Sequence, residues 1–135
     1  MEELREIVEK LRRSLNLAAV VLFESRARGD YDLLVITWFR ESYLDRIKLV
    51  LDILADVKIP VEPHPYTPQE ALEMLRKGSP TIVDALEEGI VLYDSGWLKA
   101  LRDELKRIKK RGLRRSKTTI ILPRRAEEGE GRTSS

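Results

Sequence analysis

The first half of the chain alternates between helical and strand-like hydrophobic patterns. Residues 2–15 repeat apolar groups with the i, i+3, i+4, i+7 spacing of an amphipathic helix, and acidic residues come early and basic ones late. Residues 17–23 and 31–37 are continuous apolar runs that predict two buried strands, the second continuing towards Phe39. A second amphipathic helix is predicted over 41–57, with an apolar face formed by Leu44, Ile47, Leu51 and Leu54.

The second half begins with a proline-rich strand. Residues 58–66, KIPVEPHPY, contain three prolines, which cannot donate to a strand ladder, so this strand is expected at a sheet edge. Thr67-Pro68-Gln69-Glu70 is a capping box that starts a helix. The further predicted elements are helices ending near Lys77, Gly89 and Arg111, the last of them starting at Trp97 with Asp94 or Ser95 as its cap, and strands at 90–93 and 118–122.

Strands that alternate with helices predict a single α/β (α+β) domain with a mixed sheet and helices packed on it. Because the first two strands are apolar on both faces, the helices should cover both sides of the sheet. We expect the domain to span residues 1–111, followed by a basic linker and late strand at 112–122. Residues 123–135 have no apolar side chain beyond Ala126 and are expected to be disordered.

Composition narrows the function classes. Charged residues make up 36% of the chain and cysteine is absent, which is typical of heat-adapted cytoplasmic proteins and excludes disulfides and thiolate metal sites. A single histidine excludes a multi-histidine zinc cluster. No apolar stretch reaches the roughly 18 residues of a membrane span, so we expect a cytoplasmic protein without membrane contact.

Two carboxylates at the start of the second strand are the strongest chemical signal. Asp30 and Asp32 are two positions apart, so both side chains should leave the strand on one face, opposite Tyr31 and Leu33. Paired negative charges favour a divalent cation. The preceding turn is basic, and Arg28 has space beside Gly29 to contact a phosphate. The alternative is a solvated Gly-Asp turn without a ligand.

These residues carry a family resemblance. The segment ESRARGDYDLLV resembles the GSRARG…DxDLLV signature of the polymerase-beta-like nucleotidyltransferases, and in particular their minimal, single-domain prokaryotic members. The segment VEPHPYTPQE at 61–70 is similar to the strand that carries the family's third acid and to the helix after it, and 79–94 is similar to the segment that follows. The resemblance covers residues 1 to about 111.

The resemblance implies roles for individual residues. Asp30 and Asp32 match the two metal-binding aspartates, and Glu62 matches the third carboxylate, which serves as base or metal ligand. Ser25 matches the serine that contacts the terminal phosphates of the nucleotide. The implied activity is transfer of a nucleoside monophosphate, AMP from ATP, to a hydroxyl of a macromolecule with two Mg²⁺ ions. The implied partner is a small helical HEPN-type protein, the two forming an antitoxin and toxin pair.

Other features keep alternatives open. Glu24 stands where the family has a glycine that lets the backbone approach phosphates, and the loop before Asp30 is shorter; both favour a catalytically degenerate relative that binds a partner protein. Residues 106–117 are strongly basic, which fits a solvated helix end or, alternatively, RNA binding. His64 shares a strand face with Glu62, and we interpret it as an exposed or hydrogen-bonded side chain rather than a ligand. A homodimer through an edge near 58–66 or 118–122 also stays open.

Overall fold

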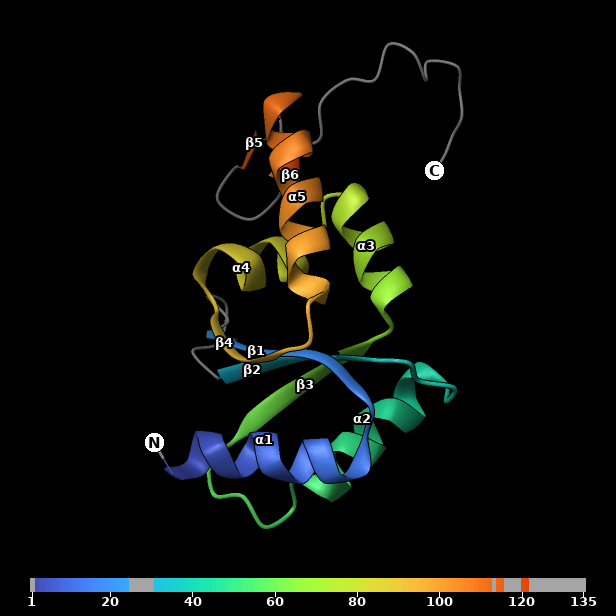
Figure 1. Ribbon diagram of the computed structural model, residues 1–135, viewed down its shortest axis with the longest axis vertical. Coiled ribbons are helices and arrows are strands. Elements are labelled where there is room, and N and C mark those ends of the chain that lie inside the picture. The colour runs from blue at the N-terminus through green and yellow to red at the C-terminus, as the bar shows by residue number, and fades with distance from the viewer. Residues whose placement is uncertain (1, 25–30, 113, 116–119, 122–135) are drawn as a thin grey trace.

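A computed structural model describes residues 2–24, 31–112, 114–115 and 120–121 (Figure 1). The elements follow the order α1 (Glu2–Ser14), β1 (Leu17–Glu24), β2 (Tyr31–Thr37), α2 (Tyr43–Ile53), β3 (Val61–Tyr66), α3 (Pro68–Arg76), α4 (Pro80–Glu88), β4 (Ile90–Asp94), α5 (Trp97–Lys110), β5 (Arg114–Arg115) and β6 (Ile120–Ile121). The predicted alternation of strands and helices is confirmed.

The main sheet is mixed, as predicted, with strand order β3-β2-β1-β4. Strand β1 pairs antiparallel with both β2 and β4, whereas β2 pairs parallel with β3. The proline-rich β3 lies at the predicted edge position. Pro63 and Pro65 are two residues apart, so their missing N–H groups fall on the same side of the strand, and Glu62, His64 and Tyr66 can donate to β2.

Helices cover both faces of the sheet, which confirms the expectation drawn from its apolar strands. Figure 1 shows α1 and α2 on one face and α3, α4 and α5 on the other. The core is correspondingly divided. Alternate residues of β2 pack on opposite sides: Leu33 and Val35 contact the α1–α2 layer, and Leu34 and Ile36 contact the α3–α5 layer. Each strand residue therefore has its face fixed by burial.

The predicted helix over 41–57 is too long, and its predicted apolar face is confirmed only in part, since Leu54 is buried as expected. Helix α2 spans only Tyr43–Ile53, because Ser42 caps its start and Leu54 its end. Leu44 is 75% exposed and Leu51 is 46% exposed, whereas the buried positions of the helix are Arg46 and Val50. The guanidinium of Arg46 can be buried because the carboxylate of Glu70 in α3 pairs with it. The buried face of the helix therefore includes a charged residue.

The helix caps agree closely with the sequence. Thr67 and Glu70 form both hydrogen bonds of the predicted capping box at the start of α3. At α5 the cap residue is Gly96, with a positive φ of 116°, rather than Asp94 or Ser95. The Asp94 carboxylate nevertheless accepts from the backbone N–H groups of Gly96 and Leu98, so it supplies the capping contacts that the sequence predicted.

The chain after α5 is described only in part. Ile120–Ile121, within the predicted late strand, pairs antiparallel with Arg114–Arg115 as a separate small sheet. The remaining positions of the predicted strand and residues 123–135 lie outside the described residues. Among the helices that the structure describes, none combines the length and apolar character required to cross a membrane.

Candidate metal centre

Asp32 is a buried carboxylate in the second strand of the sheet. It is 2% exposed, and it alternates with Leu33 so that it shares the α3–α5 face with Leu34. Tyr31 and Leu33 point to the other face, as predicted. An ionised carboxylate so far from water requires compensation by hydrogen bonds or by a positive charge.

Parallel pairing of β2 with β3 brings two further polar side chains beside Asp32. Glu62 is the register partner of Asp32, and His64 is the register partner of Leu34, so all three side chains leave the same face of adjacent strands. One potential ligand atom from each of the three residues lies within 4.8 Å of the others. Among the described residues, this is a group with the composition and spacing of a metal site.

The two oxygens of Asp32 have unequal surroundings. Oδ1 lies 2.7 Å from His64 Nε2, and because an ionised carboxylate only accepts, the imidazole N–H donates. Oδ2 is buried and has no hydrogen-bond partner within the described part of the chain. The imidazole ring also packs against Phe23, with ring centroids 5.7 Å apart. The cluster therefore combines an apolar wall, one satisfied oxygen and one orphaned oxygen.

An orphaned buried carboxylate oxygen is costly, at about 1–3 kcal/mol or more for a charged group. A divalent cation would remove this cost, because Asp32 and Glu62 supply hard oxygen ligands and His64 supplies an imidazole nitrogen. The residues present thus fit a divalent cation by their donor chemistry and by the unsatisfied oxygen.

The structure describes only some of the site residues that the sequence predicted. Asp32 and Glu62, predicted as two of three acids, lie side by side in the register. Asp30, Ser25 and Arg28 lie outside the described residues. The hydrogen bond of His64 to Asp32 was not predicted; the signal that could have found it is the i+2 spacing from Glu62 together with parallel strand pairing.

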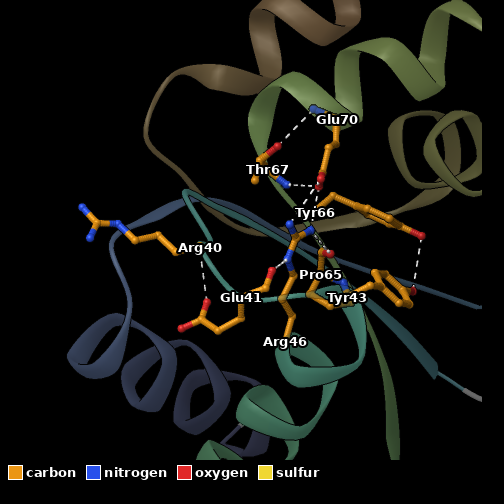
Figure 2. Close-up of polar contacts among 8 residues, drawn as sticks. All are labelled: Arg40, Glu41, Tyr43, Arg46, Pro65, Tyr66, Thr67 and Glu70. Carbon is orange, nitrogen blue, oxygen red and sulfur yellow. Dashed lines mark hydrogen bonds and ion pairs between the residues drawn. The ribbon is translucent and has the colours of Figure 1, made fainter.

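A second polar cluster occupies the other end of β3 and its connection to α3. Arg46, whose side chain is 11% exposed, forms a bidentate ion pair with Glu70, with N···O distances of 2.7 and 3.2 Å. Its Nε donates to the Glu41 carbonyl at 2.8 Å and its Nη1 to the Pro65 carbonyl at 3.4 Å (Figure 2). The guanidinium also lies 5.3 Å from the ring centre of Phe39.

Two tyrosines lie at the border of this cluster. The Tyr43 and Tyr66 hydroxyls are 3.4 Å apart, with ring centroids 5.5 Å apart (Figure 2). Burial, followed by the hydrogen bond with Tyr43, raises the pKa of Tyr66 above its ordinary value. An open hollow of about 280 Å³ lies here, lined by Tyr43, Arg46, Tyr66, Glu70, Glu73, Met74 and Lys77. The buried guanidinium in its lining, that of Arg46, is already paired with Glu70.

The described part of the basic run at 106–117 takes part in intramolecular ion pairs. Arg107 donates to Glu104 at 2.8 and 3.1 Å, and Lys109 pairs with Glu87. Glu104 is 6% exposed and also pairs with Arg76 at 3.5 Å. These contacts favour the helix-end interpretation for the part of the run that α5 contains.

Comparison with known proteins gives structural likenesses only. No family model and no curated protein matches the sequence. A solved structure of the toxin-antitoxin MntA-HepT is similar, with a TM-score of 0.49, 14% identity, and coverage of 81% of this chain and 92% of that chain. A toxin-antitoxin with AMP-PNP has a TM-score of 0.46, 14% identity, and coverage of 82% and 94%. A tri-AMPylated Shewanella oneidensis HEPN toxin in complex with MNT antitoxin has a TM-score of 0.43, 19% identity, and coverage of 81% and 82%.

Proposed function

We propose that this chain is a minimal nucleotidyltransferase that transfers AMP from ATP to a hydroxyl of a partner macromolecule. The observation that carries the proposal is the placement of Asp32 and Glu62 at one register position of adjacent parallel strands, where the buried Oδ2 of Asp32 has no hydrogen-bond partner among the residues that the structure describes. Two of the three acids that the sequence resemblance marks, 30 residues apart in the chain, thus lie on one face of the sheet.

The proposal assigns the metal to the carboxylates. Asp30, Asp32 and Glu62 would hold two Mg²⁺ ions, which when bound neutralise charge on the α-phosphate and stabilise the attacking and leaving oxygens. Asp32 is held in place by its burial and by the N–H of His64, so its carboxylate needs no rearrangement to act as a ligand. The apolar surroundings of Phe23 exclude water from one side of the cluster.

The remaining roles concern the nucleotide. Ser25 and Arg28, which lie outside the described residues, would contact its terminal phosphates. Glu62 would accept a proton from the attacking hydroxyl; its half-buried position beside Asp32 supports this role. The hydroxyl oxygen would bond to the α-phosphorus as the bond to the β-phosphate oxygen breaks, and pyrophosphate would leave.

The acceptor would come from a partner protein. Both faces of the main sheet are packed against helices of the described chain, so neither face is open to bind a macromolecular substrate. We propose a helical HEPN-type toxin as this partner, with the present chain as its antitoxin; the proposal follows from the sequence resemblance.

One observation favours a second candidate, a catalytically inactive relative that acts as a protein-binding module. His64 occupies Asp32 Oδ1 with a hydrogen bond at 2.7 Å, and Glu24 adds a negative charge in the sequence next to Ser25. In this alternative the cluster would serve stability, and neither Mg²⁺ nor ATP would bind.

Label transfer separates the two candidates. The purified chain is incubated with α-labelled ATP, Mg²⁺ and a HEPN-type protein, alongside Asp32→Ala and the matched control Asp52→Ala, which removes an exposed carboxylate from α2. The proposal predicts label on the partner with the wild type and Asp52→Ala, and none with Asp32→Ala. Equal labelling by Asp32→Ala, or none by the wild type, would refute the enzymatic function.

A further inference from the structure

We infer that His64 is a direct ligand of the cation, so that the cluster is a mixed nitrogen and oxygen site for a late first-row transition ion such as Zn²⁺ or Co²⁺. The inference concerns the same site as the proposed function and rests on it only for the two carboxylates. It assigns to the imidazole a role that a site for Mg²⁺ alone, which favours carboxylate, carbonyl and water oxygens, would not require.

The distance between His64 and Asp32 fits two ligands of one ion. Nitrogen and oxygen ligands each lie about 2.0–2.2 Å from Zn²⁺, so two that occupy neighbouring positions are about 3.0–3.4 Å apart. His64 Nε2 and Asp32 Oδ1 are 2.7 Å apart, so they need to separate by only a few tenths of an ångström. A carboxylate oxygen of Glu62 lies within 4.8 Å of one potential ligand atom of Asp32 and one of His64.

Burial provides the second, independent argument. The side chain of Asp32 is 3% exposed and that of His64 is 17% exposed, so both are largely removed from water. The hydrogen bond from His64 satisfies one carboxylate oxygen and leaves Oδ2 orphaned within the described residues. A cation bound by both side chains would contact this buried carboxylate directly and supply the partner that Oδ2 lacks within the described residues.

The donor set determines the class of ion. Imidazole suits Zn²⁺, Ni²⁺, Cu²⁺ and iron, whereas Mg²⁺ takes carboxylate and water oxygens and dehydrates reluctantly. Any site with nitrogen and oxygen donors binds Zn²⁺ more tightly than Mg²⁺, so a simple preference is not diagnostic. The diagnostic property is that Zn²⁺ and Co²⁺ affinity depends on His64, whereas Mg²⁺ affinity does not.

The composition of the chain makes a direct test feasible. The sequence contains one histidine and no cysteine, so any metal–imidazole signal from the untagged protein comes from His64. The experiment is ¹⁵N NMR of the whole chain labelled at histidine and titrated with Zn²⁺ alone, without nucleotide or partner. The inference predicts that the Nε2 resonance shifts and loses its attached proton at one equivalent of Zn²⁺. An unchanged Nε2 resonance would overturn it.

Variants of the chain measure how much His64 contributes to the affinity for each cation. Calorimetric titration of His64→Gln is expected to show Zn²⁺ and Co²⁺ affinities lowered by at least about tenfold, the loss that even supporting residues of metal sites cause, with Mg²⁺ affinity nearly unchanged. Asp52→Asn is the matched control and should behave as the wild type. Unchanged Zn²⁺ affinity in a folded His64→Gln protein would contradict the inference. If that variant fails to fold, the NMR titration of the wild type still decides.

The result is separable from the fate of the proposed function. A shifted Nε2 resonance without label transfer supports the ligand role and rejects the enzyme. Label transfer with Mg²⁺ and an unshifted resonance does the reverse, because it leaves His64 as a hydrogen-bond donor to Asp32.

Discussion

Two polar clusters lie beside strand β3. They differ in how many of their buried polar atoms have a hydrogen-bond partner. At the α3 end, Arg46 uses its guanidinium on Glu70, on two backbone carbonyls and on the ring of Phe39. Near the start of the strand, Asp32 shares a hydrogen bond with His64 and keeps one buried oxygen without a partner in the described chain. Both clusters are buried beside the same strand, yet only one is electrostatically complete.

The difference indicates what each cluster is for. A buried charge whose hydrogen bonds are all made within the protein holds elements together, and here it joins α2 to β3 and α3. A buried charge left short of one partner costs stability, and such a cost is expected where a ligand supplies the missing contact. We therefore propose that the Arg46 cluster serves stability and that the Asp32 cluster serves cation binding.

The largest expected effect tests whether the Arg46 cluster stabilises the fold. Arg46→Met should lower the free energy of unfolding by about 2–4 kcal/mol, because it removes four hydrogen bonds and leaves Glu70 without its cationic partner. Cation affinity should stay unchanged. Urea denaturation measures the first effect and calorimetry the second, with Lys48→Met, an exposed position of α2, as control. A decrease in the free energy of unfolding of no more than about 0.5 kcal/mol would contradict a stabilising role for this cluster, because ordinary surface substitutions have effects of that size.

The second prediction comes from the site. A divalent cation at 100 times its dissociation constant should raise the free energy of unfolding of the wild type by about 2.7 kcal/mol, and a chelator should reverse this. Asp32→Asn should abolish the gain while its metal-free stability stays within about 1 kcal/mol of the wild type, since it removes a buried charge of which only one oxygen has a hydrogen-bond partner among the described residues. Thermal unfolding with and without the cation checks both, and a full gain in the variant would place the cation elsewhere.

The fold could be predicted from the sequence, but only part of the candidate site could. Helical and strand periods placed the elements because each strand face is fixed by burial, and the prolines of β3 marked it as an edge. The capping box at Thr67 and Glu70 is local and was readable for the same reason. Helix α2 was predicted too long because the hydrophobic periodicity of a sequence does not show where the backbone hydrogen bonds of a helix end.

What could not be read depends on contacts between distant segments. Arg46 occupies a buried face because Glu70, 24 residues later, pairs with it, and no local pattern encodes that partner. The His64 contact with Asp32 spans 32 residues and follows from the parallel register of β2 and β3. The convergence of Asp32 with Glu62 was expected only through the family resemblance.

A third, smaller effect concerns a carboxylate between two arginines on the α5 side. Glu104 should contribute about 1–2 kcal/mol to the free energy of unfolding through its charged hydrogen bonds with Arg107 and Arg76, the range being reduced because both arginines are more than half exposed. Glu104→Gln, measured by urea denaturation at neutral pH, should lose this amount. Asp103→Asn should change less, because the neighbouring Asp103 is only half-buried and pairs with the exposed Lys99; equal losses would contradict the contribution of Glu104.

The smallest effect is a pH dependence that belongs to the Arg46 cluster. The hydrogen bond from Arg46 holds the pKa of Glu70 below its ordinary value. A depressed carboxyl pKa stabilises the fold above the unfolded-state value of about 4.3, and this stabilisation is lost as the pH falls through the lower folded value. Glu70→Gln should therefore flatten part of the acid limb of stability against pH, measured by thermal unfolding. An unaltered acid limb would show that Glu70 does not titrate with folding.

The most direct test of the assignment is equilibrium Mn²⁺ binding, followed by loss of the electron paramagnetic resonance signal of the free ion. It compares the wild type with Asp32→Asn and Glu70→Gln, one carboxylate from each cluster. The account predicts that the wild type and Glu70→Gln bind Mn²⁺ with similar affinity and that Asp32→Asn does not bind. Equal binding by all three proteins, or binding lost only in Glu70→Gln, would contradict it.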